Sequence, residues 1–210
     1  MRICVTCSAY PVVGIHMKHL AYFVLILTSC TSTMTERTNL WNTFDPNSHL
    51  QPEMNATEFD SLHSWDFGWE LLEPLNKATS DEHEIELSNR FSPGQKALYF
   101  FWYLDGQVTN GGFIQFYWNG YGKYLPAITD GLTLIGDTEM NKLVSEVEHY
   151  ITENLSTFRK AERDDDFSGA YEQLPEMEKF EDRYFELHDR TMELIEQYAR
   201  TNPNEFAKLK

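Results

Sequence analysis

Residues 103–124 read YLDGQVTNGGFIQFYWNGYGKY, and the rest of the chain is organised around this stretch. It holds five glycines and seven aromatic residues. Aromatic side chains of this size need burial, and glycines determine where the backbone can turn between them. The stretch therefore predicts a junction between two buried helices. Asn110 is expected to cap the second helix, Gly111 and Gly112 to lie in its first turn, and Phe113 to begin its apolar surface.

The polar residues of this stretch allow a second interpretation, a small-ligand or enzymatic pocket. Its lining would be Asp105, Asn110, Gln115, Tyr117 and Asn119. Buried amides more often hydrogen-bond to backbone groups, so a structural role is favoured. The chain contains no G-x-S-x-G, Walker or H-E-x-x-H motif, and we predict no enzyme, no catalytic residue and no cofactor.

Two acid–histidine pairs have a spacing that is used by metal sites in helical bundles. They are Asp60 with His63 and Glu146 with His149. Both lie in ordinary amphipathic patterns, where charged side chains usually face solvent. We therefore predict no metal site.

The sequence before and after the central stretch predicts further helices. Ser92 can cap a helix, Pro93 suits its first position, and Gln95 completes a capping box. The wide apolar arc that follows is typical of a central, buried helix. Other helices are expected over residues 58–78, 123–135, 137–152 and 175–201, with residues 80–89 an acidic loop or a short helix and residues 154–174 irregular. No strand is indicated, so the predicted fold class is all-α: a single domain of about five or six helices around a central aromatic-rich helix pair.

The N-terminal region has the features of a signal peptide. A short basic start at residues 17–19 precedes the apolar run LAYFVLIL at residues 20–27, which is too short to span a bilayer. Residues 27–30 read LTSC and resemble a bacterial lipobox. We predict a signal peptide over residues 1–29, a lipid-anchored Cys30 and an envelope location, with Met17 as an alternative start. The alternative is a chance apolar N-terminus on a cytoplasmic protein. Residues 30–57 are expected to form a polar tether and residues 58–210 the helical domain.

The charge is strongly acidic, with 17 basic and 33 acidic side chains and a net charge of −16. Direct binding of nucleic acid is disfavoured, because Lys and Arg supply most of that affinity. Acidic residues are concentrated between residues 136 and 196, a stretch that contains 18 acidic and 7 basic residues. This surface predicts either a basic protein partner or solubility alone. The residues that we predict to bind a partner are Asp164, Asp165, Asp166, Glu178 and Asp182.

Several short motifs carry a family resemblance. They are LDG at residues 104–106, NGGFIQF at 110–116, WN at 118–119, LIG at 134–136 and FEDRY at 180–184. Together they resemble the DNA-mimic protein (DMP-type) C-terminal domain family over residues 60–208. The family motif corresponds here to Asp105, Asn110, Gly111, Gly112, Phe113, Gln115 and Asn119.

The resemblance implies an all-helical, dimeric and non-enzymatic protein. A described family member presents carboxylates where DNA phosphates would lie and occupies a helix-turn-helix regulator. By that logic the partner is a basic DNA-binding surface, and the mechanism is competition with DNA. The alternative function is an envelope lipoprotein of structural or immunity type.

Overall fold

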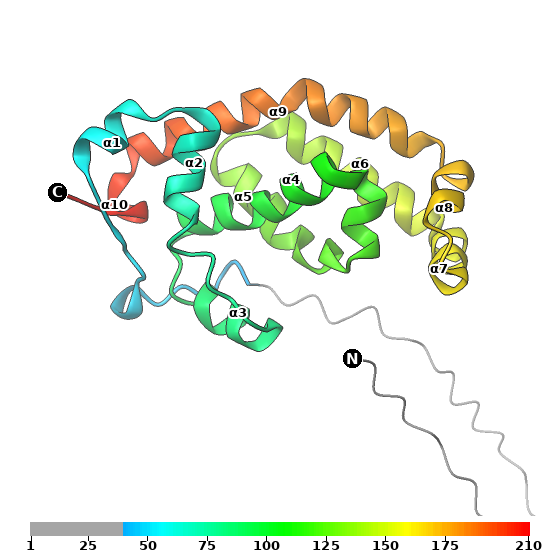
Figure 1. The fold of residues 1–210 in the computed structure, drawn as a ribbon, viewed down its shortest axis with the longest axis horizontal. Helices are drawn as coiled ribbons and strands as arrows, with labels where there is room; N and C mark the ends of the chain where they lie inside the picture. Colours follow the sequence, from blue (N-terminus) through cyan, green and yellow to red (C-terminus); the bar gives the residue numbers. More distant parts are fainter. Residues whose placement is uncertain (1–39) are drawn as a thin grey trace, which may run out of the picture. The chain divides into compact units, whose positions relative to one another are not determined.

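The computed structural model describes residues 40–210, which form one mostly helical unit (Figure 1). The predicted all-α class is confirmed, although the described residues contain ten α-helices and two short 3-10 helices rather than five or six helices. The predicted helix over residues 58–78 is two helices, the predicted irregular stretch over residues 154–174 holds two more, and a short helix lies at residues 81–88 and another at residues 203–206. These helices are α1 (Ala56–Ser61), α2 (Ser64–Leu72), α3 (Asp81–Ser88), α7 (Leu155–Asp164), α8 (Phe167–Gln173) and α10 (Pro203–Phe206).

Helix α4 (Pro93–Trp118) is the central element and packs against α5 (Leu125–Leu134) and α9 (Glu176–Thr201) (Figure 1). Its predicted capping box is present: the Gln95 backbone N–H donates to Ser92 Oγ at 3.1 Å, and the Ser92 N–H donates to Gln95 Oε1 at 2.9 Å. The helix is buried on several sides. Its fully buried residues include Leu98, Tyr99, Phe100, Phe101, Leu104, Phe113, Ile114 and Phe116.

The two halves of α4 meet at a kink at the glycine pair, which confirms the predicted junction between two buried helices. Gly112 has φ +73° and ψ −177°, which is outside helical geometry. The Phe113 N–H donates to Glu181 Oε1 of α9 at 3.0 Å. The Tyr171 hydroxyl lies 2.7 Å from the carbonyl oxygen of Gly111 and 2.9 Å from the same Glu181 oxygen. A distant carboxylate therefore caps the second half of α4.

The prediction that Asn110 provides this cap is wrong. Its side-chain amide donates to Gln115 Oε1 at 3.0 Å. Local sequence suggested Asn110 because it directly precedes the glycines, whereas the residue that reaches Phe113 is 68 positions away.

Helices α6 (Thr138–Glu153) and α9 complete the helical core around α4 and α5. Asp137 caps α6, because its Oδ1 accepts the Met140 N–H at 3.1 Å, and its Oδ2 accepts from Thr191 Oγ1 of α9 at 2.5 Å. Helix α9 follows Pro175 and ends before Asn202, as predicted. The 3-10 helix η2 (Tyr121–Tyr124) connects α4 to α5.

The predicted tether over residues 30–57 is wrong for its described part, residues 40–57. Leu40 is buried, and the fully buried Lys96 donates to the carbonyl oxygens of Leu40 at 2.5 Å and Trp41 at 3.0 Å. Burial lowers the pKa of Lys96 to about 8. The segment also contains the 3-10 helix η1 (Pro46–Ser48) and the short strand β1 (Glu53–Met54). The polar side chains of this segment did not indicate these contacts, because most of the contacts are made by backbone carbonyl groups.

The two ends of the described region meet near the N-terminus of α4. Strand β1 pairs in parallel with β2 (Lys208–Leu209), a pairing that the sequence did not indicate. Glu205 of α10 accepts the Gly94 N–H at 2.7 Å through its carboxylate. Its backbone carbonyl accepts from Ser92 Oγ at 2.8 Å.

The predicted signal peptide and Cys30 lie outside the described residues. Within residues 40–210, no helix combines the length and the apolar character needed to cross a membrane.

Candidate functional site

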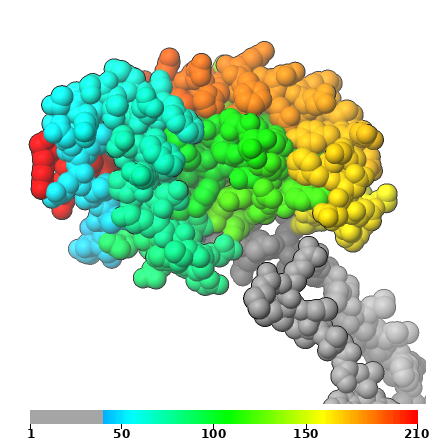
Figure 2. Space-filling view, in the orientation of Figure 1, coloured from blue at the N-terminus to red at the C-terminus, as the bar shows by residue number. Residues whose placement is uncertain are grey.

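An acidic row runs along the exposed side of α9. Five exposed carboxylates follow one another at intervals of three or four residues, which places them on one side of the helix. At 1.5 Å per residue the row spans about 22 Å. Figure 2 shows α9, in orange, along the outer edge of the described unit. The residues of this acidic row are Glu178, Asp182, Glu186, Asp189 and Glu193.

Nearby basic side chains pair outside the acidic row. Arg183 lies 2.5 Å from Glu146, Arg190 lies 2.7 Å from Glu139, and Lys179 lies 2.7 Å from Glu176. Within the described residues, no Lys or Arg nitrogen lies within 4.0 Å of a carboxylate of the row. Among residues 40–210, the ion pair of Asp189 is with His188, at 3.2 Å. The row therefore presents to solvent negative charge that no described Lys or Arg pairs.

Two of the five predicted partner-binding residues belong to the acidic row, Glu178 and Asp182. The other three, Asp164, Asp165 and Asp166, are exposed at the end of α7 and in the turn before α8. Asp165 has a left-handed φ of +54°, and Asp166 Oδ1 accepts the Gly169 N–H at 2.9 Å. Asp164 lies 3.8 Å from Lys160.

The other members of the row, Glu186, Asp189 and Glu193, were not among the predicted partner-binding residues. The signal for them was the continued three- and four-residue spacing of acids along one long helix.

The polar residues of the family motif do not converge on one pocket. Asp105 is buried and accepts hydrogen bonds from the Tyr184 hydroxyl at 2.8 Å and from His188 Nε2 at 3.0 Å. This contact with Asp105 raises the pKa of His188. Tyr117 packs edge-on against Phe158 elsewhere.

The remaining amides of the motif bond to one another on the surface. Gln107 Oε1 accepts from Gln115 Nε2 at 3.2 Å and from Asn119 Nδ2 at 2.7 Å, and Gln115 Oε1 accepts from Asn110. These amides link the two halves of the bent α4. They bond to side chains rather than to the backbone groups that buried amides usually satisfy.

The two acid–histidine pairs considered for metal binding lie on different elements, one at α1 and the start of α2 and the other on α6. His149 contacts Glu153 at 3.2 Å, and Glu146 pairs with Arg183. His63 contacts Glu196 at 2.8 Å. Within residues 40–210, no group of three or more potential metal-ligating side chains is found.

Comparison with known proteins places these features in a family. The family model described as DMP19-like protein matches residues 89–202, more than half of the 210 residues. The DNA mimic protein DMP19 of Neisseria meningitidis serogroup B (strain ATCC BAA-335 / MC58) is 27% identical over 121 residues, which cover 56% of this chain and 73% of that protein. The matched segment runs from the residues before α4, with its bend, to the end of α9 and its acidic row. The chain therefore belongs to the DMP19-like protein family.

Proposed function

We propose that this protein is a non-catalytic DNA mimic whose acidic row occupies the basic DNA-binding surface of a partner protein. The observation that carries the proposal is that the row is exposed and that no Lys or Arg of the described residues forms an ion pair with it. The relative named DNA mimic protein DMP19 supports it at the level of the family.

The charge density of the row is comparable to that of a DNA strand. Five carboxylates lie along about 22 Å of helix. One strand of B-DNA carries one phosphate per about 3.4 Å, or about six over the same length. A partner that reads DNA through Lys and Arg can form charge-assisted hydrogen bonds with these carboxylates instead. The proposed mechanism is competition, and it requires no reaction.

The proposal is tested by displacement of DNA from defined regulators. Helix-turn-helix regulators of the same organism are each bound to fluorescent operator DNA, and the full chain is added as competitor. We expect the chain to release DNA from at least one regulator, less effectively as salt rises. If no regulator is released, the proposal is wrong.

A neutralised variant assigns the effect to the acidic row. It combines Glu178→Gln, Asp182→Asn, Glu186→Gln and Glu193→Gln. At about 0.5–1 kcal/mol per exposed pair, the change weakens competition by about 30-fold or more. The matched control, which removes the same charge from exposed positions on α1 to α3, is Asp60→Asn with Glu70→Gln, Glu73→Gln and Glu86→Gln. An equal loss in both variants would show that net charge matters and the row does not. Asp165 and Asp166 are left unchanged because of their roles in the α7–α8 turn.

We also propose that Cys30 carries a lipid anchor, on the strength of the signal-like residues 17–30. In that case the basic partner is accessible from the envelope. Membrane fractionation of the native protein and of Cys30→Ala tests this, and soluble native protein with an intact N-terminus would contradict it. The homodimer implied by the family resemblance is tested by sedimentation of the purified chain.

A further inference from the structure

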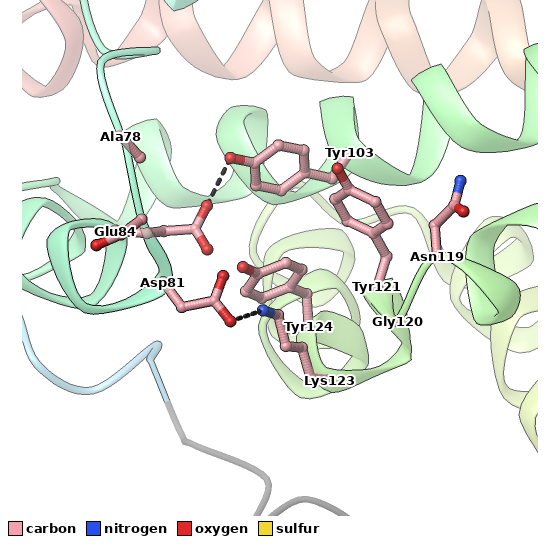
Figure 3. Close-up of a pocket in the computed structure, with 10 residues that line it drawn as sticks. Ala78, Asp81, Glu84, Tyr103, Asn119, Gly120, Tyr121, Lys123 and Tyr124 are labelled. Carbon is pink, nitrogen blue, oxygen red and sulfur yellow. Dashed lines mark hydrogen bonds and ion pairs between the residues drawn. The ribbon is translucent and has the colours of Figure 1, made fainter. Parts of the chain in front are cut away.

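A small cavity lies between the start of α3 and the junction of α4 with η2 (Figure 3). It has a volume of about 240 Å³. Its walls combine charged side chains with tyrosine rings. The residues that the argument uses are Asp81, Glu84, Tyr103, Tyr121, Lys123 and Tyr124.

Glu84 is the most buried charged group of this cavity, with 5% of its surface exposed. Its Oε1 accepts hydrogen bonds from the hydroxyls of Tyr103 at 2.5 Å and Tyr99 at 3.2 Å. These donors are neutral, and burial raises the pKa of Glu84. No Lys, Arg or His nitrogen of the described residues forms an ion pair with Glu84. The second carboxylate oxygen is turned toward the cavity (Figure 3).

The other charges of the cavity compensate one another. Lys123 Nζ lies 2.8 Å from Asp81 Oδ2 and 4.9 Å from the centroid of the Tyr124 ring. Two carboxylates and one ammonium leave the cavity with one excess negative charge, because Lys123, whose charge also acts on Glu84, forms its ion pair with Asp81. Buried charges in proteins are normally paired, because an unpaired one is costly to desolvate.

The tyrosine rings supply a second feature that favours a cation. The centroid of Tyr103 lies 5.2 Å from that of Tyr121 and 5.3 Å from that of Tyr124, so the three rings form one aromatic cluster. Aromatic faces attract guanidinium and ammonium groups. A hard metal ion would instead need several oxygen ligands.

We propose that this cavity binds one organic cation, a guanidinium or primary ammonium group, whose charge meets Glu84 and whose apolar part lies against the tyrosine rings. Drug-sized ligands occupy about 300–1,000 Å³, so this cavity suits a small amine or a single side chain. The cation comes either from a free small molecule or from an Arg or Lys of a bound protein. Helix α9 contributes no residue to the cavity, so the site does not depend on the acidic row.

The site is tested by NMR titration of the full chain with methylguanidinium, using the neutral isostere methylurea as the matched ligand. We expect saturable shifts at the amides of Tyr103, Tyr121 and Lys123 with methylguanidinium only. Glu84→Gln is expected to weaken binding by about tenfold or more, because it removes a charge-assisted hydrogen bond. Glu82→Gln changes an exposed acid of the same helix that does not line the cavity, and should leave binding unchanged. Equal binding of methylurea, or full affinity in Glu84→Gln, would overturn the proposal.

A second pair of variants covers the case in which Glu84→Gln does not fold. Tyr121→Phe keeps the ring and should keep binding, whereas Tyr121→Leu should weaken it; equal affinity in the two variants contradicts the aromatic part of the site. A short peptide with one arginine then identifies the source: displacement of methylguanidinium indicates a protein side chain, and its absence indicates a free small cation. The variant with a neutralised acidic row should still bind methylguanidinium, so the two proposals fail separately.

Discussion

Replacing Gly112 with alanine tests the account of the bend in α4. At φ +73° and ψ −177°, Gly112 occupies a region that is almost exclusive to glycine. Residues forced into such geometry carry strain of about 1–3 kcal/mol. An added Cβ would also lie 2.0 Å from Glu181 Oε1 and 2.0 Å from the Tyr171 hydroxyl. Both groups must move, and Phe113 then loses its cap.

The expected loss of stability follows from these two terms. A hydrogen bond to a charged group contributes about 1.5–3 kcal/mol. Adding the strain gives about 2.5–6 kcal/mol, a large share of the roughly 5–15 kcal/mol typical of a domain. Gly106→Ala is the matched control, because Gly106 lies in the same helix and its added Cβ would meet no atom within 4 Å. That change should stabilise the protein by about 0.5–1 kcal/mol.

The measurement is urea unfolding of the full chain followed by far-UV circular dichroism. The denaturant midpoints of Gly112→Ala and Gly106→Ala should shift in opposite directions, with similar dependence on urea. If Gly112→Ala destabilises by less than about 1 kcal/mol, or behaves like Gly106→Ala, the proposed capping of α4 by Glu181 is wrong.

Two further predictions concern buried or half-buried ionisable groups. The hydrogen bond to Asp105 raises the pKa of His188 above its usual 6.5. Their contact therefore stabilises the fold fully below pH 6.5, and this stability is lost as the pH rises through the higher pKa of the folded state. Asp189 and Tyr184 also face the His188 ring. His188→Gln should therefore reduce the fall in unfolding free energy between about pH 6 and 8. Lys96→Met removes the hydrogen bonds to the carbonyl oxygens of Leu40 and Trp41. The amides of residues 40–50 should then exchange their hydrogens faster. Unaltered exchange there would show that Lys96 does not hold this segment.

The parts of the fold that the sequence predicts well depend on local signals. Ser92 and Gln95 form the expected capping box because a box needs only four consecutive residues. Helix α9 ends at Thr201, two residues before Pro203, whose ring cannot continue the helix. The junction at the glycine pair of α4 was predicted from local sequence, but its cap was not, since the cap comes from Glu181 and no local pattern indicates a residue that distant.

The acidic row and the cavity at Glu84 also differ in how clearly the local sequence indicates them. The acidic row could be inferred because exposed charge on a long amphipathic helix repeats every three or four residues. Glu84 was missed because it stands among solvated acids, Asp81, Glu82 and Glu86. One signal was available: Glu84 precedes Leu87 by three residues and Ser88 by four, and both are buried, which places Glu84 on the buried side of α3.

The contact between Glu205 and the start of α4 also has a consequence for biosynthesis. Gly94 and Glu205 are separated by 111 residues. At about 5–20 residues per second, a ribosome needs roughly 5–20 s to produce the second partner after the first. During that interval the aromatic surface of α4 lacks α9, α10 and the carboxylate that closes its first turn. The nascent chain is therefore most prone to aggregation in the middle of translation, and a chain that stops before residue 205 never passes beyond that stage.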